Sequence, residues 1–332
     1  MSLLYIDKSD CVIGKQDNRI SVKYKDGLVR TIPIEGVDGI TILGHAQVTT
    51  QCIQECLSRG ISLSYFSKGG KYFGRLCSTG HIKAQLQRKQ ASLYDTPFAL
   101  ELSKKIINAK IHNQLVVLRR YARSTRQDIS DIEIQMKSAL KKIPYTKKSE
   151  ELIGYEGTAA KAYFKGLSRC IKPEFQFKGR SKRPPRDPFN SMISLGYSIL
   201  MNELYGEIES KGLNPYFGFL HKDAEKHPTL ASDMMEEWRA VLIDSCVMSM
   251  INGNEVNISD FYSENDEGVY ISKEALRKYI KKLEYKFQVC QKYLDYVEYP
   301  ISFRTAIAFQ MCSLVDAIEN EDVSMYSPIM IR

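Results

Sequence analysis

Hydrophobic residues follow two different spacings along the chain. Over about the first eighty residues they fall in short segments that are rich in β-branched and aromatic residues and are separated by turn-forming residues, a pattern typical of β-strands. These segments are SLLYI, RISVKY, GLVRTIPI, GITILG, ISLSYF and KYFGRLC. We therefore expect the first part of the chain to be β-rich.

Turn residues connect several of these predicted strands. Asp26-Gly27 lies between RISVKYK and LVRTIPI, and Asp-Gly is a strong signal for a two-residue hairpin turn. Gly69-Gly70 takes the same position between the last two segments. One helix is expected among the strands, from about residue 47 to 58, with Gly60 ending it because glycine readily adopts the left-handed conformation at a helix C-terminus.

From about Ile82 onward the spacing becomes helical. A long helix is predicted after Thr96 and Pro97, and another after Asp187 and Pro188, because a capping residue followed by proline is typical of a helix start. Two more long helices are predicted over SDMMEEWRAVLIDSCVMSMING and SKEALRKYIKKLEYKF. The fold class is thus α+β, with a small β-rich domain over residues 1–80 and a large all-α domain over residues 81–332.

Composition narrows the class of protein further. No run approaches the roughly 18 apolar residues of a membrane helix, and the first residues lack the pattern of a signal peptide. We expect a cytoplasmic protein without a membrane partner. The 8 cysteines include no CxxC pair, and Cys52 and Cys56 lie one turn apart on the inner face of the first predicted helix. They are interpreted as buried, reduced thiols.

One acidic residue lies on the apolar face of a predicted helix. In ELIGYEGTAAKAYF, Leu152, Glu156, Ala159 and Tyr163 share one face at helical spacing. A buried ionised carboxylate costs several kcal/mol unless a cation pairs with it. Either Glu156 reaches water from the flank of its helix, or a cation lies opposite it.

A second unusual segment combines histidine and carboxylates. Asp233 and Glu236 are three residues apart and project from one helix face, and His221 follows an apolar run. Oxygen-rich ligands with a single imidazole suit Mg²⁺ or Mn²⁺ better than zinc. The alternatives are a hydrogen-bonded core histidine and a solvated acidic face.

Several segments resemble those of a known family. They occur in the order GYEGTAAKAYF, PPRDPFNSMISLGYSIL, GLNPYFGFLH and SDMMEEWR, and the weaker matches NDEGVYISKEALRKYIKKLE and SMYSPIMIR follow. In this order and spacing they resemble the universal CRISPR adaptation integrase, the first-numbered CRISPR-associated protein of prokaryotes. The β-rich first part fits the small N-terminal domain of that family.

The resemblance implies roles for the residues that match. Glu156, His221 and Glu236 are implied as ligands of one divalent cation, Mg²⁺ or Mn²⁺, and Asp233 as a supporting catalytic residue. The implied reaction is attack of the 3′-hydroxyl of a captured DNA fragment on a phosphodiester of the CRISPR repeat, which inserts a new spacer. Such a site needs a neutral His221, so activity is expected to fall as the pH drops through its titration range.

Basic clusters are candidates for binding double-stranded DNA. The net charge is +8, and phosphate binding depends on local patches rather than on this total. The candidate residues are Lys178, Arg180, Lys182, Arg183 and Arg186 in one loop, and Arg119, Arg120 and Arg123 near a helix end. Each cluster is alternatively a solvated face. Tyr163, Tyr197 and Tyr205 either stack on splayed bases or belong to the core.

The resemblance also implies partners. In the family two subunits form a homodimer through the β domain, and two such pairs flank a dimer of the small second-numbered CRISPR-associated protein, giving a heterohexamer. Two rival hypotheses remain at this point. The first is a metal-dependent nuclease acting on branched or damaged DNA, and the second is a DNA scaffold without enzymatic activity.

Overall fold

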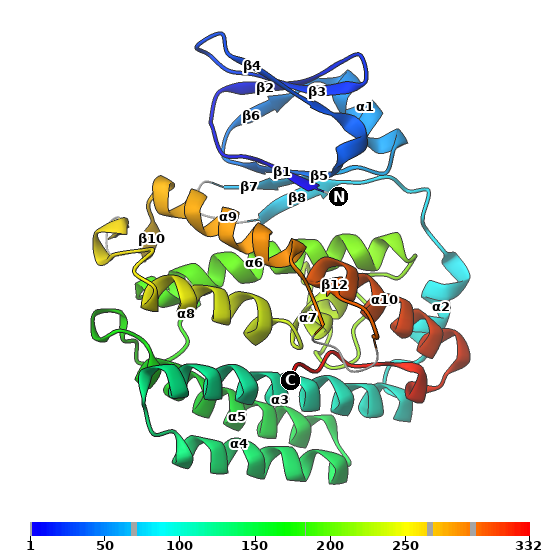
Figure 1. Ribbon diagram of the computed structural model, residues 1–332. Coiled ribbons are helices and arrows are strands. Elements are labelled where there is room, and N and C mark those ends of the chain that lie inside the picture. The colour runs from blue at the N-terminus through cyan, green and yellow to red at the C-terminus, as the bar shows by residue number, and fades with distance from the viewer. Residues whose placement is uncertain (1, 68–71, 183, 264–267, 293–296) are drawn as a thin grey trace. The chain divides into compact units, whose positions relative to one another are not determined.

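The computed structural model describes residues 2–67, 72–182, 184–263, 268–292 and 297–332. The chain divides into two units, Met1–Ile82 and Lys83–Arg332 (Figure 1). The sequence had placed the domain boundary after residue 80. Arg183 and the predicted Gly69-Gly70 turn lie outside the described residues.

The N-terminal unit is built from two four-stranded sheets, with strand orders β1-β5-β7-β8 and β4-β3-β2-β6. In the first sheet β5 pairs in parallel with β1 and β7, and β8 is antiparallel to β7. In the second, β3 is antiparallel to both neighbours and β6 is parallel to β2. The strands are β1 Ser2–Ile6, β2 Cys11–Gln16, β3 Arg19–Lys23, β4 Val29–Pro33, β5 Val37–Leu43, β6 Ala46–Val48, β7 Ser62–Phe66 and β8 Tyr72–Leu76.

The predicted hairpin at Asp26-Gly27 is confirmed, but its loop is longer than two residues, since the Tyr24 amide donates to the Leu28 carbonyl at 2.9 Å. Lys23 of β3 pairs with Val29 of β4, and Gly27 has a φ of 82°, which glycine adopts without steric cost. The predicted helix is also present as α1 (Thr50–Ser58), but it begins later than expected. Residues 46–48 form β6 instead, because they continue the second sheet beside β2.

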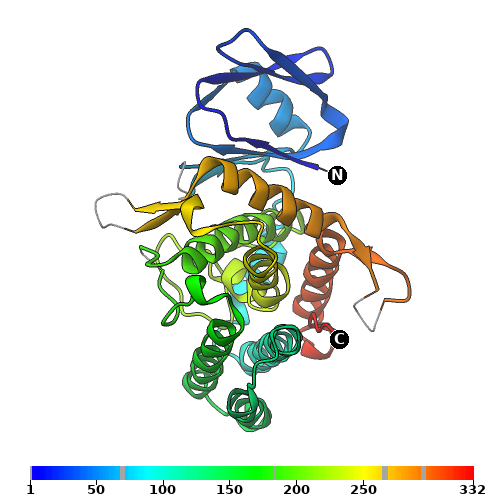
Figure 2. The ribbon, with the colours of Figure 1, turned by 60° about the vertical axis from the view of Figure 1, so that its left-hand side comes forward.

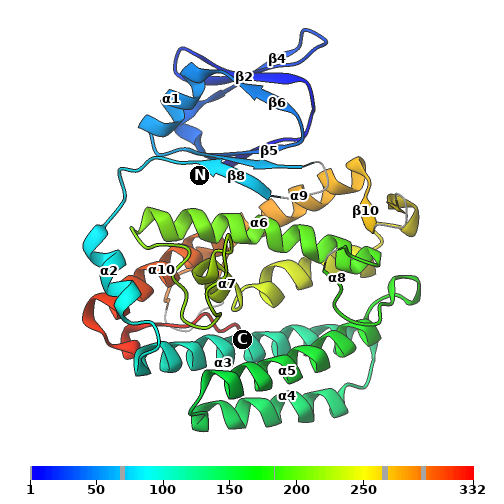
Figure 3. The ribbon, with the colours of Figure 1, turned by 180° about the vertical axis from the view of Figure 1, so that it is seen from behind.

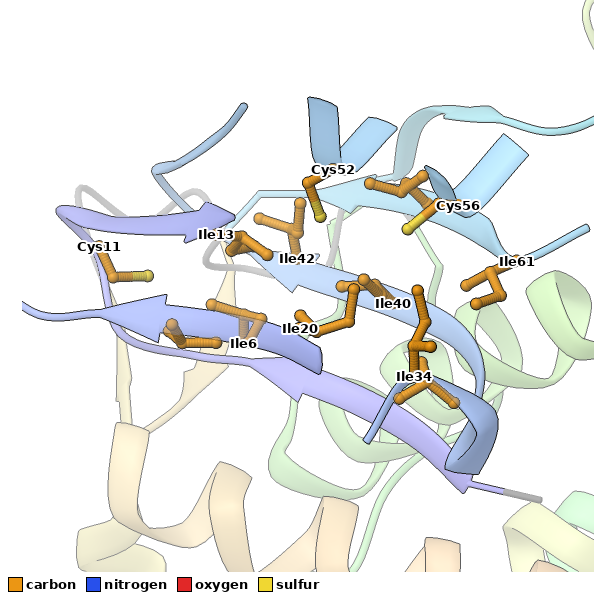
Figure 4. Close-up of a cluster of buried hydrophobic side chains, with 13 residues drawn as sticks. Ile6, Cys11, Ile13, Ile20, Ile34, Ile40, Ile42, Cys52, Cys56 and Ile61 are labelled. Carbon is orange, nitrogen blue, oxygen red and sulfur yellow. The ribbon is translucent and has the colours of Figure 1, made fainter. Parts of the chain in front are cut away.

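The core of this unit lies under α1. Cys52 and Cys56 are both fully buried and point into a cluster of isoleucines from β2, β3 and β5 (Figure 4). The expected buried thiols are therefore confirmed, and the small sulfur side chains fill space between helix and sheets.

Helices make up most of the C-terminal unit. α3, α4 and α5 run side by side, α7 contacts α3, and α6 packs against α7 (Figures 1 and 3). The helices are α2 Ala84–Ser92, α3 Pro97–Thr125, α4 Ser130–Lys142, α5 Ser149–Cys170, α6 Pro188–Ser210, α7 Thr229–Met235, α8 Ser245–Asn252, α9 Lys273–Gln288 and α10 Phe303–Asn320. The α+β class is confirmed.

Two short strand pairs modify the all-α expectation for this unit. β9 (Phe261–Ser263) pairs with β10 (Val269–Ile271), and β11 (Cys290–Gln291) pairs with β12 (Ile301–Ser302). Figure 2 shows these pairs at opposite ends of α9. They were not predicted because runs of two or three residues carry too little alternation to be recognised.

The predicted helix over residues 232–253 is not continuous. α7 ends at Met235, a π-helical segment η4 follows at Arg239–Asp244, and α8 begins at Ser245. Nearly all of this stretch is buried, so the hydrophobic pattern carried no information about where the helix changes its winding. π-Helical turns are frequent at functional sites. Within the described residues, no helix is both long and apolar enough to cross a membrane.

Candidate active site

A cavity of about 1010 Å³ lies in the C-terminal unit and collects three of the four residues predicted to be catalytic. Its wall includes Glu156 from α5, His221 from the segment before α7, and Glu236 directly after α7. Leu152, Ala159 and Tyr163 on the same face of α5 are fully buried, as their spacing predicted. Three side chains from distant parts of the sequence therefore face one cavity.

Asp233 holds His221 in place. Its Oδ2 accepts hydrogen bonds from the backbone amides of Phe219 (2.7 Å) and Leu220 (3.0 Å). Its Oδ1 accepts the amide of His221 at 3.1 Å and contacts Nδ1 of the same imidazole at 2.6 Å. Because both oxygens are occupied in this way and the side chain is fully buried, Asp233 orients the histidine rather than facing the cavity.

Glycine at position 218 permits this arrangement. A Cβ atom there would lie 2.8 Å from Asp233 Oδ2 and 2.9 Å from the backbone carbon of Thr229. The Gly218 amide also donates to Thr229 Oγ1 at 3.0 Å. The loop before α7 can approach the helix closely enough to surround Asp233 only because residue 218 has no side chain.

The two ring nitrogens of His221 have different surroundings. With Nδ1–H donating to Asp233, the lone pair of Nε2 faces Glu236, whose Oε1 is 4.0 Å away. Burial alone would lower the pKa of His221, but the hydrogen bond to Asp233 and the negative charges of Asp233 and Glu236 raise it above the ordinary 6.5.

Glu236 is almost completely buried, and cations keep it ionised. Arg239 Nη2 lies 3.1 Å from its Oε1, and Lys110 Nζ lies 2.6 Å from its Oε2. Burial would raise the pKa of Glu236, yet the charges of Arg239, Lys110 and His221 lower it to about 2. Oε2 is buried, and among the described residues its close partner is the ammonium of Lys110, which it meets as an ion pair.

Lys110 was not predicted from the sequence. It lies on α3, and its ammonium group bridges Glu236 and Glu156, with a hydrogen bond to Glu156 Oε1. Its side chain is only 8% exposed. Among the described residues, no three His, Cys, Asp or Glu side chains converge closely enough to hold a metal ion as they stand. The ammonium of Lys110 lies between the two carboxylates.

The donor set nevertheless fits a hard divalent cation. It consists of two carboxylates and one imidazole nitrogen, and the buried Glu236 Oε2 has a cation as its close partner. The carboxylates already surround one cationic group, the ammonium of Lys110. The residues present therefore fit Mg²⁺ or Mn²⁺ in chemistry, and the lysine occupies the space between them.

Only some of the basic residues predicted to bind DNA line the cavity. Lys178, Arg180 and Lys182 contribute to its wall, and so do Lys161, Lys165 and Arg169 of α5, which no sequence signal had indicated. Arg119, Arg120, Arg123 and Arg186 are not among its lining residues. Arg119 is paired instead with Glu133 of α4, with nitrogen to oxygen distances of 3.0 and 2.9 Å.

The basic loop is attached to α6 through Asn190. Asn190 Oδ1 accepts from Arg180 (2.9 Å) and from the Ser181 amide (3.1 Å), while its Nδ2 donates to the Gly179 carbonyl at 2.8 Å. The same helix begins with the predicted cap, since Asp187 accepts the Asn190 amide. At the other predicted start, Thr96 makes no side-chain cap bond and donates to the Leu93 carbonyl.

Two of the candidate stacking tyrosines belong to the core. Tyr163 and Tyr197 are buried, and their hydroxyl groups donate to Asp244 at 3.0 and 2.6 Å. Burial raises the pKa of Asp244 to about 6, although the two hydroxyls oppose this shift. The ring of Tyr197 lies under the guanidinium groups of Arg180 and Arg239 and thus supports the cavity wall.

Glu237, the neighbour of Glu236, faces away from the cavity. It accepts hydrogen bonds from the Tyr326 hydroxyl (2.7 Å), the Ile329 amide (2.6 Å) and Gln310 (3.0 Å). Burial raises its pKa to about 8, against the effect of these bonds. These bonds hold residues 326–329 beside Glu237. The acidic run in the sequence did not indicate this role for Glu237.

Comparisons with known proteins agree with this architecture. A family model described as CRISPR associated protein Cas1 matches residues 4–285. A protein of Mycobacterium tuberculosis named CRISPR-associated endonuclease Cas1 is 39% identical over 321 residues, which cover 96% of this chain and 94% of that protein.

Solved structures show the same fold. A chain of a Cas6-RT-Cas1–Cas2 complex superposes with a TM-score of 0.85 and 26% identity over 99% of this chain and 36% of its own length. A casposase bound to its integration product gives a TM-score of 0.86 with 22% identity over 98% of this chain and 93% of its own, a likeness of fold. Because the family model and the tuberculosis relative each cover most of the sequence, the chain belongs to the CRISPR-associated protein Cas1 family.

Proposed function

We propose that this protein is a DNA endonuclease and integrase of CRISPR adaptation, which inserts captured DNA into the CRISPR array by transesterification. The observation that carries the proposal is the convergence of Glu156, His221 and Glu236 on one cavity with basic walls. Membership of the Cas1 family, and a relative named as an endonuclease, support the nuclease part.

Glu156, His221 and Glu236 are proposed to hold one Mg²⁺ or Mn²⁺ ion. When bound, such an ion lowers the pKa of an attacking hydroxyl and offsets charge that develops on phosphate oxygens. Asp233 keeps the Nδ1 proton of His221 in place and so leaves Nε2 available as a donor. Asp233 is thus a positioning residue in this proposal.

The basic wall is proposed to bind the DNA backbone. Lys178 and Lys182 are exposed, and Arg239 lies beside Glu236, where a phosphate would meet all three cations. In the reaction, the 3′-oxygen of the fragment forms a bond to a repeat phosphorus, and the bond from that phosphorus to its leaving oxygen breaks. The hydroxyl proton passes to solvent, and the leaving oxygen takes up a proton.

Partners are proposed on the same basis. The similar chain in the Cas6-RT-Cas1–Cas2 complex is named in an assembly with Cas2. We propose that this protein likewise forms a homodimer and joins a Cas2-type partner in a heterohexamer on double-stranded DNA. Two active sites in one assembly would allow both ends of a fragment to be joined.

A strand-transfer assay tests the function. A supercoiled plasmid that carries a repeat is incubated with short DNA duplexes, the Cas2-type partner and Mn²⁺ or Mg²⁺. The wild type is expected to give covalent fragment–plasmid products, whereas Glu156→Ala, His221→Ala and Glu236→Ala give none. Glu151→Ala removes an exposed carboxylate of the same helix and serves as the matched control.

The products separate the alternatives. Cut DNA without joined products would favour a metal-dependent nuclease acting on branched or damaged DNA, in which water replaces the 3′-hydroxyl. Unchanged reactions in all three alanine variants would exclude a catalytic role for this site, and a scaffold would then fit better.

A further inference from the structure

The ammonium of Lys110 lies where two proposed ligands meet. It contacts Glu236 Oε2 at 2.6 Å and donates a hydrogen bond to Glu156 Oε1. Lys110 and Glu236 have side chains that are 8% and 4% exposed, so water does little to screen these charges. The lysine thus neutralises two carboxylates that would otherwise repel each other in a buried place.

A divalent ion and this ammonium cannot both lie between the same two oxygens. Ligand distances for Mg²⁺ and Mn²⁺ are about 2 Å, shorter than the contacts that Lys110 makes, and the two cations would repel strongly at such a separation. Binding of the ion through Glu156 and Glu236 therefore requires that the ammonium move away from at least one of them.

The structure contains an acceptor for the displaced lysine. Gln114 lies one turn further along α3, four residues after Lys110, and both side chains line the cavity. Gln114 is 4% exposed, and its Oε1 is buried with no hydrogen-bond partner among the described residues. A buried carbonyl oxygen without a donor is costly, and an ammonium group turning toward it would supply one.

We propose that Lys110 is a built-in competitor of the metal ion: it bridges Glu156 and Glu236 in the metal-free protein and moves toward Gln114 and the cavity when the ion binds. The proposal rests on the proposed function, because it assumes that these carboxylates are ligands. Lys110 keeps the empty site folded and lowers its affinity for the ion. Once displaced, its charge faces the cavity, where a DNA phosphate can pair with it, so that DNA and metal favour each other's binding.

Calorimetric titration of Mn²⁺ into the DNA-free protein tests this competition. Lys110→Met removes the charge and keeps a similar length, and it is expected to bind Mn²⁺ about tenfold more tightly than the wild type. Lys165→Met is the matched control, since Lys165 is an exposed cation on the cavity wall that bridges no ligands, and it should leave the affinity nearly unchanged.

Thermal unfolding provides a second readout. Without Mn²⁺, Lys110→Met is expected to melt below the wild type because its two carboxylates lack a counter-ion. Mn²⁺ should then raise the melting temperature of Lys110→Met more than that of the wild type. If Lys110 had only a structural role, Lys110→Met would lower the melting temperature by the same amount with and without Mn²⁺.

Lys110→Arg provides an independent measurement of the competition if Lys110→Met does not fold. Arginine can bridge both carboxylates with more donors, so it is expected to bind Mn²⁺ more weakly than the wild type. Equal or tighter binding by Lys110→Arg, or equal or weaker binding by a folded Lys110→Met, would overturn the proposal.

Two results distinguish this inference from the proposed function. If Mn²⁺ binding is lost in Glu236→Ala but is insensitive to residue 110, the competition fails and the metal site stands. If neither the wild type nor a folded Lys110→Met binds Mn²⁺, both fail together.

Discussion

Asp233 Oδ1 lies 2.6 Å from Nδ1 of His221 and accepts the backbone amide of the same residue at 3.1 Å. One buried carboxylate thereby fixes both the ring and the main chain of the histidine. The lone pair of Nε2 is directed at Glu236 as a result. Similar outer partners of metal-binding histidines fix the tautomer and raise the basicity of the ligand.

Replacing Asp233 by asparagine is expected to weaken the site without changing any ligand. Asparagine offers one carbonyl oxygen in place of two carboxylate oxygens, so some of the amides of residues 219–221 lose their acceptor. We expect Mn²⁺ affinity to fall about 10- to 100-fold and the free energy of unfolding to fall by about 1–3 kcal/mol. Titration calorimetry and chemical denaturation measure the two effects. Wild-type Mn²⁺ affinity in Asp233→Asn would show that Asp233 does not position the ligand.

Metal affinity should depend on pH through His221. The pKa of this ring is raised above 6.5 because the bond to Asp233 and the negative charges of Asp233 and Glu236 outweigh the effect of burial. Only the neutral ring can donate to a metal, so Mn²⁺ affinity should decline as the pH falls through this raised pKa. Titrations at several pH values measure the decline. In Asp233→Asn it should begin at lower pH, and an unshifted profile would contradict the assignment.

The cavity predicts which basic residues contact DNA. Lys178 and Lys182 line it, whereas Arg119 is paired with Glu133 outside it. Each lost phosphate contact reduces the slope of log affinity against log salt by about 1. Lys178→Ala combined with Lys182→Ala should therefore flatten the slope by about 2, measured by fluorescence anisotropy over a salt series. Arg119→Ala is the comparison and should leave the slope unchanged, whereas a loss of about 1 there would show that DNA extends beyond the cavity.

Glu237 should make stability depend on pH. Its pKa is raised by burial to about 8 from an ordinary 4.5, so its stabilising contribution is complete below the lower value and is lost as the pH rises through the higher one. Relative to Glu237→Gln, which carries no titrating group, the wild type should lose at most about 5 kcal/mol of unfolding free energy between these limits. Denaturant titrations at pH 5 and pH 9 measure the difference. If the unfolding free energies of the two proteins change equally between pH 5 and pH 9, Glu237 is ionised in the folded protein at both pH values.

Local patterns predicted the parts of the site that lie within one element. The spacing of Leu152, Ala159 and Tyr163 placed Glu156 on the inner face of its helix, and all three neighbours are buried. The three-residue spacing of Asp233 and Glu236 placed both on one side of the predicted helix. Asp233 lies on α7 and Glu236 directly after its end, at 2.6 and 4.0 Å from the ring nitrogens of His221. These features follow from the spacing of residues within one helix, which can be read from a single sequence.

Features that depend on contacts between distant elements were not predictable. Lys110 is one of several lysines on α3, and nothing in its own helix shows that α5 and the end of α7 supply its partners. The tie between Glu237 and Tyr326 joins residues 89 positions apart. The break in the helix over residues 232–253 could not be predicted because nearly all of that segment is buried. It has no polar face whose spacing would change where the winding changes.

The central claim is that Glu156, His221 and Glu236 bind one divalent ion together. Crystals soaked in Mn²⁺ and measured near the manganese absorption edge test it most directly. The account predicts one anomalous peak bounded by these three side chains, with the ammonium of Lys110 moved away from the two carboxylates. A peak that lies elsewhere, or Lys110 still bridging Glu156 and Glu236 at saturating Mn²⁺ with no peak beside them, would contradict it.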